Sequence, residues 1–458
     1  MKVAVVGLGK LGAPLAAVLA SKGNDVVGID VNREVVWALG EGRAPVDEPG
    51  LAERISAAGD RLTATTDFSA VADREVIILL VPTPSDERGA FTNAYLLDAL
   101  EQIGPGLAGQ DGYQVVVAAS TVMPGSCDSE IRAALERTSG RYVGDSLGLC
   151  YSPEFIALGN VVSDLLHPDM VLIGESDPRA GDVLEELYAG VCENDPPFRR
   201  MNLVNAELTK IAVNTYVTMK ISYANTLADM CERLPGGDVD SVTDAVGLDS
   251  RVGHKYLHGA VAYGGPCFPR DNKAFAVLAR DIGAESVLAE ATDAVNVAQT
   301  DRLARIVLSR LKPGNVVGIL GLAYKPDTGV IDESPGIALA RLLGRDGFEV
   351  NAYDPVALDA AMRALGDSAR GASSVAQLLE RSDVVVIATP WPEFADLPLD
   401  SLNRERDRLV VIDCWRLLSH QRYGDTIEIV RLGRPLEPAR PIPVGAEGDD
   451  HAPSHLAD

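Results

Sequence analysis

Residues 2–22 read KVAVVGLGKLGAPLAAVLASK, and this stretch decides the fold of the first part of the chain. The apolar run at its start is typical of a buried parallel strand, and the run after the last glycine has the composition of a helix. Between them, Gly7, Gly9 and Gly12 form the pattern GxGxxG. Such glycines make a tight turn, admit a pyrophosphate to the backbone amides and let the helix pack on the strand. The stretch therefore predicts a dinucleotide-binding turn.

A second strand is predicted at residues 25–30 and ends in Asp30, close to the ~20-residue offset expected after such a turn. An acidic side chain at this place binds the ribose 2′-hydroxyl, which favours NAD over NADP. Arg33 lies nearby and can receive a 2′-phosphate, although a solvated helix position is the more common role for such a residue. Further strands are predicted at residues 76–81, 114–119 and 147–152. Their alternation with helical or loop segments predicts a doubly wound parallel sheet.

Turns that carry hydroxyl and carboxyl groups follow these strands. VPTP contains Thr83 and STVMPG contains Thr121, and both turns fall where an open parallel sheet binds its ligand. Serine and threonine at strand ends are also ordinary turn and cap residues, so ligand binding and local capping both stay open. In YSPEF, Glu154 lies just past the next strand and beside Phe155. Its carboxylate is either a catalytic base or a group at the start of a helix.

The composition bounds the class of protein. A chain of 458 residues with 47% hydrophobic residues predicts two or three domains. The formal charge of −25 argues against nucleic acid or an anionic membrane as a partner, because both bind clustered basic residues. The six cysteines lie far apart without a CxxC pair, which predicts neither a metal site nor disulfides and indicates a reducing, cytoplasmic environment. No apolar run approaches the ~18 residues of a membrane span.

Residues 203–234 lack proline and glycine and carry apolar residues at helical spacing, which predicts one long helix within an all-α segment. Lys210 and Asn214 are four residues apart and therefore share a face, with Glu207 one turn earlier. A glutamate and a lysine at this spacing usually form a solvated ion pair of small energy. The asparagine added to this face, in the middle of a buried-looking helix, favours a functional role.

Residues 263–273, YGGPCFPRDNK, place a thiol and a carboxylate in a turn rich in glycine and proline. Gly264 lets the backbone approach a ligand, and the basic residues on either side of Asp271 are expected to hold Cys267 as a thiolate. Taken alone, a free cysteine is more often a buried structural thiol. The preceding segment RVGHKYLH, residues 251–258, supplies the local basic groups that phosphate ligands require from an acidic protein.

A second alternating run follows the KPG boundary at residues 312–314, with strands predicted at residues 316–320, 348–353, 384–388 and 409–412. Its first turn, GLAYKPDT, lacks GxGxxG, so a second dinucleotide is not expected. Lys325 in this turn suits one phosphorylated ligand. Asp354 and the segments TPW and DCWR follow the later strands, again at the edge where a parallel sheet binds ligands. Disorder is expected from Leu436 onward, where the chain is Pro-rich and acidic.

The chain resembles the nucleotide-sugar 6-dehydrogenases, the family of UDP-glucose and GDP-mannose dehydrogenases. The resemblance extends to about residue 433 through an ordered set of motifs: GLGKLG, VPTP, STVMPG, YSPEF, RVGHKYL, YGGPCFPRD, GLAYKPDT and TPWPEF. It implies two Rossmann-like doubly wound parallel-sheet domains joined by a long central helix within an all-α middle domain. The implied division is an NAD-binding domain at 1–200, a central dimerisation domain with the cysteine loop at 201–311, a nucleotide-sugar-binding domain at 312–435 and a tail at 436–458.

The activity implied by the resemblance is a four-electron oxidation of a sugar C6 alcohol to a carboxylate by two NAD+ in succession. UDP-glucose is the expected substrate, and a UDP-N-acetylhexosamine, GlcNAc or ManNAc, is the alternative. By resemblance, Cys267 adds to the aldehyde to give a thiohemiacetal, whose oxyanion Lys210 and Asn214 stabilise, and a thioester follows. Asp271 acts with these two groups as the base of the first oxidation.

The resemblance also implies the other residues of the site. The water that hydrolyses the thioester is oriented by Thr121, Glu154 or Asp271. NAD is expected to contact Gly7, Gly9, Lys10, Leu11, Gly12, Asp30, Thr83, Thr121 and Lys325. The sugar nucleotide is expected to contact Glu154, Phe155, Lys210, Asn214, Arg251, Lys255, His258, Tyr263, Gly264 and Lys325. Arg251 is implied to reach the neighbouring site across a homodimer interface.

Two other functions stay open at this point. A two-electron dehydrogenase related to the hydroxy-acid enzymes would need neither Cys267 nor the third domain, and a silent regulator would bind NAD and a nucleotide without turnover. Three departures from the family pattern bear on the choice of sugar nucleotide. Arg270 stands where lysine is usual, and Met170 and Asp332 stand where many members have arginine.

Overall fold

The computed structural model describes residues 1–399, 408–418 and 426–436, so the predicted tail beyond Leu436 lies outside the described residues. The chain divides into two compact units. The first consists of Met1–Met219, Gly264–Ala294 and Lys325–Glu333. The second consists of Lys220–Tyr263, Val295–Tyr324 and the chain from Ser334 onward. No helix in the described ranges is both long and apolar enough to cross a membrane.

The first unit is built on an eight-stranded sheet. Its strands are β1 (Lys2–Val6), β2 (Asp25–Ile29), β3 (Leu62–Thr65), β4 (Val76–Leu79), β5 (Gln114–Ala118), β6 (Leu147–Tyr151), β7 (Val171–Glu175) and β8 (Phe198–Asn202). Their order in the sheet is β3-β2-β1-β4-β5-β6-β7-β8. Neighbouring strands are parallel, but β7 runs antiparallel to β6. The predicted doubly wound sheet is confirmed, with a reversal of direction between β6 and β7.

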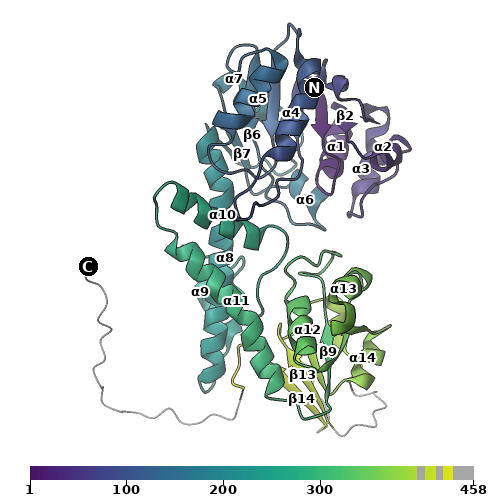
Figure 1. The fold of residues 1–458 in the computed structure, drawn as a ribbon, viewed down its shortest axis with the longest axis vertical. Coiled ribbons are helices and arrows are strands. Elements are labelled where there is room, and N and C mark those ends of the chain that lie inside the picture. Colours follow the sequence, from purple (N-terminus) through teal and green to yellow (C-terminus); the bar gives the residue numbers. More distant parts are fainter. Residues whose placement is uncertain (400–407, 419–425, 437–458) are drawn as a thin grey trace, which may run out of the picture. The chain divides into compact units, whose positions relative to one another are not determined.

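Helices cover both faces of this sheet, so its central strands are buried on both sides (Figure 1). Successive side chains of a strand point to opposite faces, so Val3 and Val5 lie in one core and Ala4 and Val6 in the other. The first core packs against α1 (Gly12–Ser21), α3 (Leu51–Ala58), α6 (Val161–Leu166) and α7 (Pro178–Ala189). The second core packs against α4 (Ala94–Leu107) and α5 (Arg132–Ser139). α2 (Arg33–Gly40) follows β2.

The strands that the sequence predicts in this unit are confirmed to within two residues at their ends. The edge strands β3 and β8 were not predicted. Their side chains are largely half-buried or exposed, and β8 carries Arg199 and Arg200, so neither strand shows the continuous apolar run of a buried parallel strand. Arg33 is exposed at the start of α2, in agreement with the solvated role.

The middle of the chain is helical. It contains α8 (Leu203–Arg233), α9 (Val239–Leu248), α10 (Phe268–Asp281) and α11 (Val287–Leu308). The long helix begins at the predicted residue and ends one residue before the predicted end. α8 and α11 each contribute residues to both units.

The second unit contains a six-stranded sheet. Its strands are β9 (Val316–Leu320), β10 (Glu349–Tyr353), β11 (Arg370–Gly371), β12 (Val384–Ile387), β13 (Leu409–Asp413) and β14 (Ile427–Arg431), and its helices include α12 (Pro335–Arg345), α13 (Leu358–Leu365) and α14 (Val375–Arg381). The order β11-β10-β9-β12-β13-β14 is parallel throughout these strands. The fold class with two Rossmann-like sheets and a helical middle region is thereby confirmed.

Candidate active site

The cysteine loop leads directly into a helix. Cys267 is the N-cap residue of α10, and the backbone N–H of Asp271 donates to the carbonyl of Cys267 at 2.8 Å. Gly265 has a φ of +88°, and its N–H donates to the carbonyl of Asp332. Cys267 is exposed, so the reading of this residue as a buried structural thiol is wrong. The turn places an accessible thiol one helical turn from a carboxylate.

Two side chains of α8 meet this helix. Asn214 Nδ2 donates to Asp271 Oδ2 at 2.5 Å, and Lys210 lies one turn earlier on the same face. Lys210 Nζ donates to the backbone carbonyl of Glu154 at 2.7 Å and lies 4.6 Å from the ring centre of Phe155. Asp271 is 1% exposed, and Lys210 and Asn214 are each 8% exposed. The predicted functional face of the long helix therefore turns towards the cysteine loop within the first unit.

Burial controls the protonation of this cluster. It lowers the pKa of Lys210, against the opposing effect of Asp271, Cys267 and Glu154. It raises the pKa of Asp271, although the hydrogen bond from Asn214 and the positive charges of Lys210 and Arg270 oppose the shift. The pKa of Cys267 is also raised, first by desolvation from the surrounding atoms and then by Asp271, although the residue as a whole is exposed. Lys210 and Arg270 lower the pKa of Cys267, as expected of basic neighbours, but they only partly offset these two effects, so the thiolate expected from the sequence stays a prediction.

One oxygen of the Asp271 carboxylate has no hydrogen-bond partner among the described residues. Its nearest cation is Arg270, whose Nε lies 3.9 Å from Oδ1. Buried acceptors are almost always paired, and an exception of this kind marks a place where a ligand or water can bind. Asp271 is therefore set to accept a hydrogen bond or a proton from a bound molecule.

The two hydroxyl-bearing turns are tied to each other and to the cysteine helix. Thr83 Oγ1 donates to the carbonyl of Thr121 at 2.7 Å, and Ser120 Oγ donates to the carbonyl of Val81 at 2.6 Å. Arg270 Nη1 donates to the carbonyl of Thr83 at 3.0 Å. The buried Thr83 hydroxyl thus holds the two turns together. Thr121 is half-buried at the edge of the sheet.

Glu207 plays a part that the sequence did not indicate. It is fully buried, and its carboxylate accepts from the backbone N–H groups of Gly125 and Cys127 at 2.6 and 2.7 Å. The interpretation of Glu207 as a solvated partner of Lys210 is therefore wrong. These N–H groups lie at and just before the start of the helical segment Cys127–Ile131, where unpaired backbone donors favour a negative charge. The sequence signal was limited to the position of Glu207 on the functional face of α8.

Glu154 lies in a loop rather than at the start of a helix. The next helix, α6, begins at Val161, and the acid that binds its first N–H groups is Glu48, at 3.0 Å from Gly159 N and 2.7 Å from Val161 N. The helix-start alternative for Glu154 is therefore wrong. Burial raises the pKa of Glu154 to about 7, while the hydrogen bond from Tyr188 and the charge of Lys210 oppose the shift. A carboxyl group with this pKa can both accept and release a proton near neutral pH.

The glycine turn fits a dinucleotide. Gly7 has a φ of +94°, and a Cβ on it would meet Leu80 O at 2.3 Å, while a Cβ on Gly12 would meet Gly7 O at 1.8 Å. A Cβ on Gly9, in contrast, would meet nothing within 4 Å, so the backbone there is open to a ligand. These positions carry the three roles expected of GxGxxG glycines. Lys10 is exposed, and Leu11 is half-buried as the N-cap residue of α1.

Asp30 follows β2 and lies against the glycine turn. Its carboxylate accepts from the backbone N–H of Leu8 at 2.6 Å and of Asn32 at 2.8 Å. Each carboxylate oxygen retains a further lone pair for a ribose hydroxyl. Asp30 and the glycine turn would therefore hold the adenosine side of NAD.

A cavity of about 580 Å³ opens beside the cysteine loop in the first unit. Its wall includes Gly265, Pro266 and Arg270 of that loop, and residues 85–89, which follow β4. Asp332, which stands where many family members have arginine, also lines it. The cavity is therefore lined by positively and negatively charged side chains, and it lies beside the loop that carries the accessible thiol.

Lys325 belongs to the first unit, although it follows the first strand of the second sheet. Its Nζ hydrogen-bonds the backbone carbonyl of Leu158, and burial lowers its pKa. The loop at 154–158 is thus held by one lysine at each end, Lys210 on Glu154 and Lys325 on Leu158.

Four predicted substrate residues belong to the second unit. Arg251, Lys255 and His258 are exposed, and Tyr263 is buried. Arg251 forms an ion pair with Asp249, with Nη2 at 2.6 Å from Oδ2. Gly264, the remaining predicted residue of this segment, is buried in the first unit. The structure thus gathers the Lys210, Asn214, Cys267 and Asp271 group within one unit.

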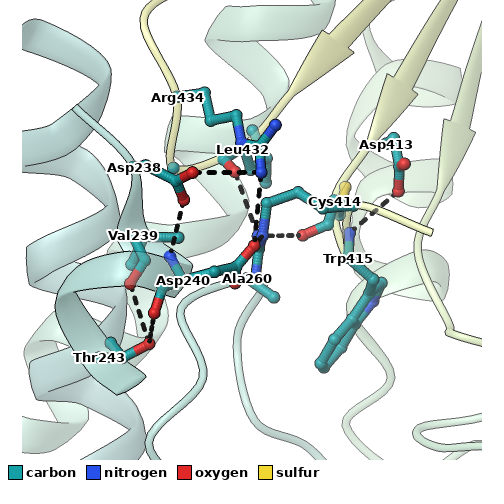
Figure 2. A network of polar contacts seen from close by, with 12 residues as sticks. Asp238, Val239, Asp240, Thr243, Ala260, Asp413, Cys414, Trp415, Leu432 and Arg434 are labelled. Atoms are coloured by element: carbon teal, nitrogen blue, oxygen red, sulfur yellow. Dashed lines mark hydrogen bonds and ion pairs between the residues drawn. The ribbon is translucent and has the colours of Figure 1, made fainter. Parts of the chain in front are cut away.

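Strand ends of the second sheet are occupied by structural contacts. Arg416 is buried, and its Nε donates to Asp240 Oδ2 at 2.7 Å. Arg434 pairs with Asp238, and Asp413 accepts from the backbone N–H of Trp415 (Figure 2). Asp354 likewise accepts from backbone N–H groups at 322, 323, 356 and 357. The Arg416 guanidinium is held against α9 by this contact, and ligand binding by the DCWR segment stays a prediction.

Domain models of the UDP-glucose/GDP-mannose dehydrogenase family match the chain along most of its length. The NAD binding domain matches residues 1–192, the central domain residues 204–298 and the UDP binding domain residues 318–420. The chain is 38% identical to UDP-glucose 6-dehydrogenase AglM of Haloferax volcanii, over 94% of this chain and 100% of that protein.

Solved structures agree. The UDP-glucose dehydrogenase of Pyrobaculum islandicum is similar with a TM-score of 0.85 at 32% identity, over 95% of this chain and 98% of that one. The UDP-D-ManNAc dehydrogenase of Pyrococcus horikoshii is similar with a TM-score of 0.80 at 25% identity, over 95% and 99% of the two chains. The chain therefore belongs to the UDP-glucose/GDP-mannose dehydrogenase family, which comprises NAD-dependent nucleotide-sugar 6-dehydrogenases.

Proposed function

We propose that the protein oxidises the C6 alcohol of UDP-glucose to the carboxylate, with two NAD+ consumed in succession. The observation that carries this proposal is the buried contact of Asn214 with Asp271 in the first turn of the helix that Cys267 begins. A nucleophile, a base and hydrogen-bond donors are gathered there, which is the set that oxidation through a thioester requires. A two-electron dehydrogenase would have no use for the thiol, and a silent regulator no use for the base.

The first oxidation needs a base for the alcohol proton. Asp271 has an oxygen without a hydrogen-bond partner among the described residues, and the pKa of Lys210 is lowered, so either group can accept the proton directly or through water. Each of the two oxidations also removes a hydride from C6, for which NAD+ is the acceptor. Asn214 holds Asp271 in place during this step.

The covalent step needs the Cys267 thiol to lose its proton, because the thiolate is the nucleophile. Lys210, with a lowered pKa, can take that proton as the sulfur bonds to the aldehyde carbon. The resulting ammonium and the Asn214 amide then stabilise the thiohemiacetal oxyanion. After the second oxidation, Glu154 takes a proton from the water that attacks the thioester, and the sulfur of Cys267 leaves.

The alternative substrates are UDP-N-acetylhexosamines, and the similarity to a UDP-D-ManNAc dehydrogenase favours UDP-ManNAc among them. The test is the end-point yield of NADH with excess NAD+ and limiting UDP-glucose, UDP-GlcNAc, UDP-ManNAc or GDP-mannose. Two NADH per UDP-glucose is the expected result. Two per UDP-ManNAc would replace the substrate but keep the reaction, and one per sugar would refute the four-electron oxidation.

We also propose a homodimer in which Arg251 serves the neighbouring site. Tyr216, Tyr223 and Met230 follow one another at intervals of seven residues on α8, and each is more than half exposed. Such a stripe is typical of a helix that packs against a partner. Arg251→Ala subunits mixed with Cys267→Ser subunits are expected to regain activity, because one of the two sites is then intact. No recovery in the mixture would refute the shared site.

We also propose the domain boundaries and the location of the protein. The division into domains at 1–200, 201–311 and 312–435 is supported by the spans of the family match. A cytoplasmic location is supported by the six free thiols, which suit a reducing compartment.

A further inference from the structure

A second cavity, of about 140 Å³, lies beside Glu154 in the first unit. It is large enough for several water molecules. Its lining comes from the Glu154 loop, from α6 and the turn after it, from the end of α7 and from α8, and includes Glu154, Asp164, Met170, Tyr188, Cys192 and Val213. The carboxyl group assigned to hydrolysis thus borders a space that the other groups of the active-site cluster do not line.

Tyr188 lines this cavity and forms a hydrogen bond with the Glu154 carboxyl group. It lies near the end of α7, is 4% exposed, and its hydroxyl donates to Glu154 Oε1 at 3.3 Å. Burial raises the pKa of Tyr188 well above its usual value, so the hydroxyl keeps its proton and stays a donor throughout the working pH range.

The other groups around Glu154 act differently. Lys210 of α8 contributes a charge, but its Nζ bonds the backbone carbonyl of Glu154 rather than the carboxylate. Asp164 of α6 accepts from the backbone N–H of Ala157, and Asp169 adds a second acidic group to the cavity wall. Cys192 lines the cavity with a pKa raised to about 11, so it is a neutral thiol. Met170 supplies an apolar side chain where many family members have arginine.

We propose that Tyr188 is a positioning residue that holds the Glu154 carboxylate in its ionised form for hydrolysis of the thioester. The inference rests on the proposed function. In this step the water oxygen bonds to the acyl carbon, the carbon–sulfur bond breaks so that Cys267 leaves as the thiolate, and Glu154 takes one proton of the water. Only the carboxylate form of Glu154 can take that proton. The hydroxyl of Tyr188 bonds the carboxylate more strongly than the neutral acid and therefore favours the reactive form.

Tyr188→Phe removes this one hydroxyl and keeps the ring. The hydrogen bond from Tyr188 lowers the pKa of Glu154, so its loss raises that pKa above the value near 7. The acid limb of the kcat profile is expected to move to higher pH by about one unit, the scale of one hydrogen bond to a charged group. At pH 6 the variant is then about tenfold slower than wild type, whereas at pH 9 the two are equal. Cys192→Ala, in the same cavity, is expected to leave the limb in place.

A second measurement does not depend on turnover. The infrared C=O stretch of protonated Glu154 is identified by its loss in Glu154→Gln, and its intensity is followed against pH in wild type and Tyr188→Phe. The midpoint is expected to rise in Tyr188→Phe by the same amount as the kcat limb, with thermal unfolding as the check that the variant is folded. An unchanged midpoint would overturn the inference. A shifted midpoint in a protein that yields one NADH per sugar would instead refute the proposed function and retain the contact.

Discussion

The amide nitrogen of Asn214 lies 2.5 Å from Oδ2 of Asp271, and this contact joins the long helix α8 to the helix that begins after Cys267. Both side chains are buried, and burial of a carboxylate is costly unless it is hydrogen-bonded. Fifty-seven residues separate the two along the chain. The contact therefore fixes the distance between the Lys210 and Asn214 face of α8 and the loop that carries Cys267.

Asn214→Ala is expected to lower kcat by about 100-fold, because it removes both an oxyanion donor and the group that holds Asp271. The free energy of unfolding should fall by about 1–3 kcal/mol, since a buried carboxylate oxygen loses its partner. Steady-state kinetics and urea unfolding measure the two effects. Thr215→Ala is the matched control, because that hydroxyl bonds only carbonyls of its own helix. Equal kcat values for the two variants would contradict the role of Asn214.

Cys267→Ser is expected to stop the reaction before the second oxidation, because a serine hydroxyl is a far weaker nucleophile than a thiolate. The end-point yield with limiting UDP-glucose should fall from two NADH per sugar to one or less. Cys192→Ser, which changes a half-buried thiol away from the cysteine loop, should keep the full yield. Full yield from Cys267→Ser would remove the thioester from the mechanism.

Alkylation of Cys267 by iodoacetamide should be slow at neutral pH and rise as the pH increases. The pKa of this thiol is raised by desolvation and by Asp271, so little of the reactive thiolate exists at pH 7. Asp271→Asn removes the negative charge and lowers the pKa, so alkylation should become about fivefold faster at fixed pH, and Lys210→Ala should slow it. Mass spectrometry of the Cys267 peptide gives the rates, with the exposed Lys273→Ala as control. The same rate in Asp271→Asn and Lys210→Ala would show that neither charge acts on the sulfur.

Glu207→Ala should cost about 2–4 kcal/mol of stability, because the buried N–H of Cys127 and the half-buried N–H of Gly125 lose their acceptor. The turn that carries Thr121 would also lose its anchor to α8, so the Kd for NAD should rise. Guanidinium unfolding and fluorescence titration with NADH measure the two quantities. Glu186→Ala, an exposed acid of α7, is the control for the loss of a carboxylate. A variant as stable as wild type would mean that water satisfies these donors.

Asp30→Ala should raise the Kd for NAD by about tenfold and leave the Kd for NADP nearly unchanged, because only the 2′-hydroxyl of NAD bonds this carboxylate. Isothermal titration with both dinucleotides measures the ratio of affinities. Glu34→Ala, four residues further along the chain at the exposed start of α2, serves as control. An unchanged ratio would mean that Asp30 serves only the Leu8 and Asn32 amides.

The sequence by itself determined the parts of this protein that depend on neighbours along the chain. The strand, glycine turn and helix at residues 2–22 follow from apolar periodicity and from positions that exclude a side chain, and the structure places β1 and α1 as predicted. Lys210 and Asn214 share a face because four residues span about one helical turn. The order of the motifs along the chain was sufficient to place the protein in its family.

Tertiary structure decided what those residues touch. Asn214 contacts Asp271, and Tyr188 contacts Glu154. Glu207 accepts from the backbone N–H of Gly125. Each contact joins residues that lie far apart in the sequence, so no local pattern encodes it. The pKa of Glu154 rises because distant elements desolvate its carboxyl group, which the local sequence around Glu154 does not encode. Local pattern fixes the backbone, whereas packing between elements sets the contacts and the charge states on which the chemistry depends.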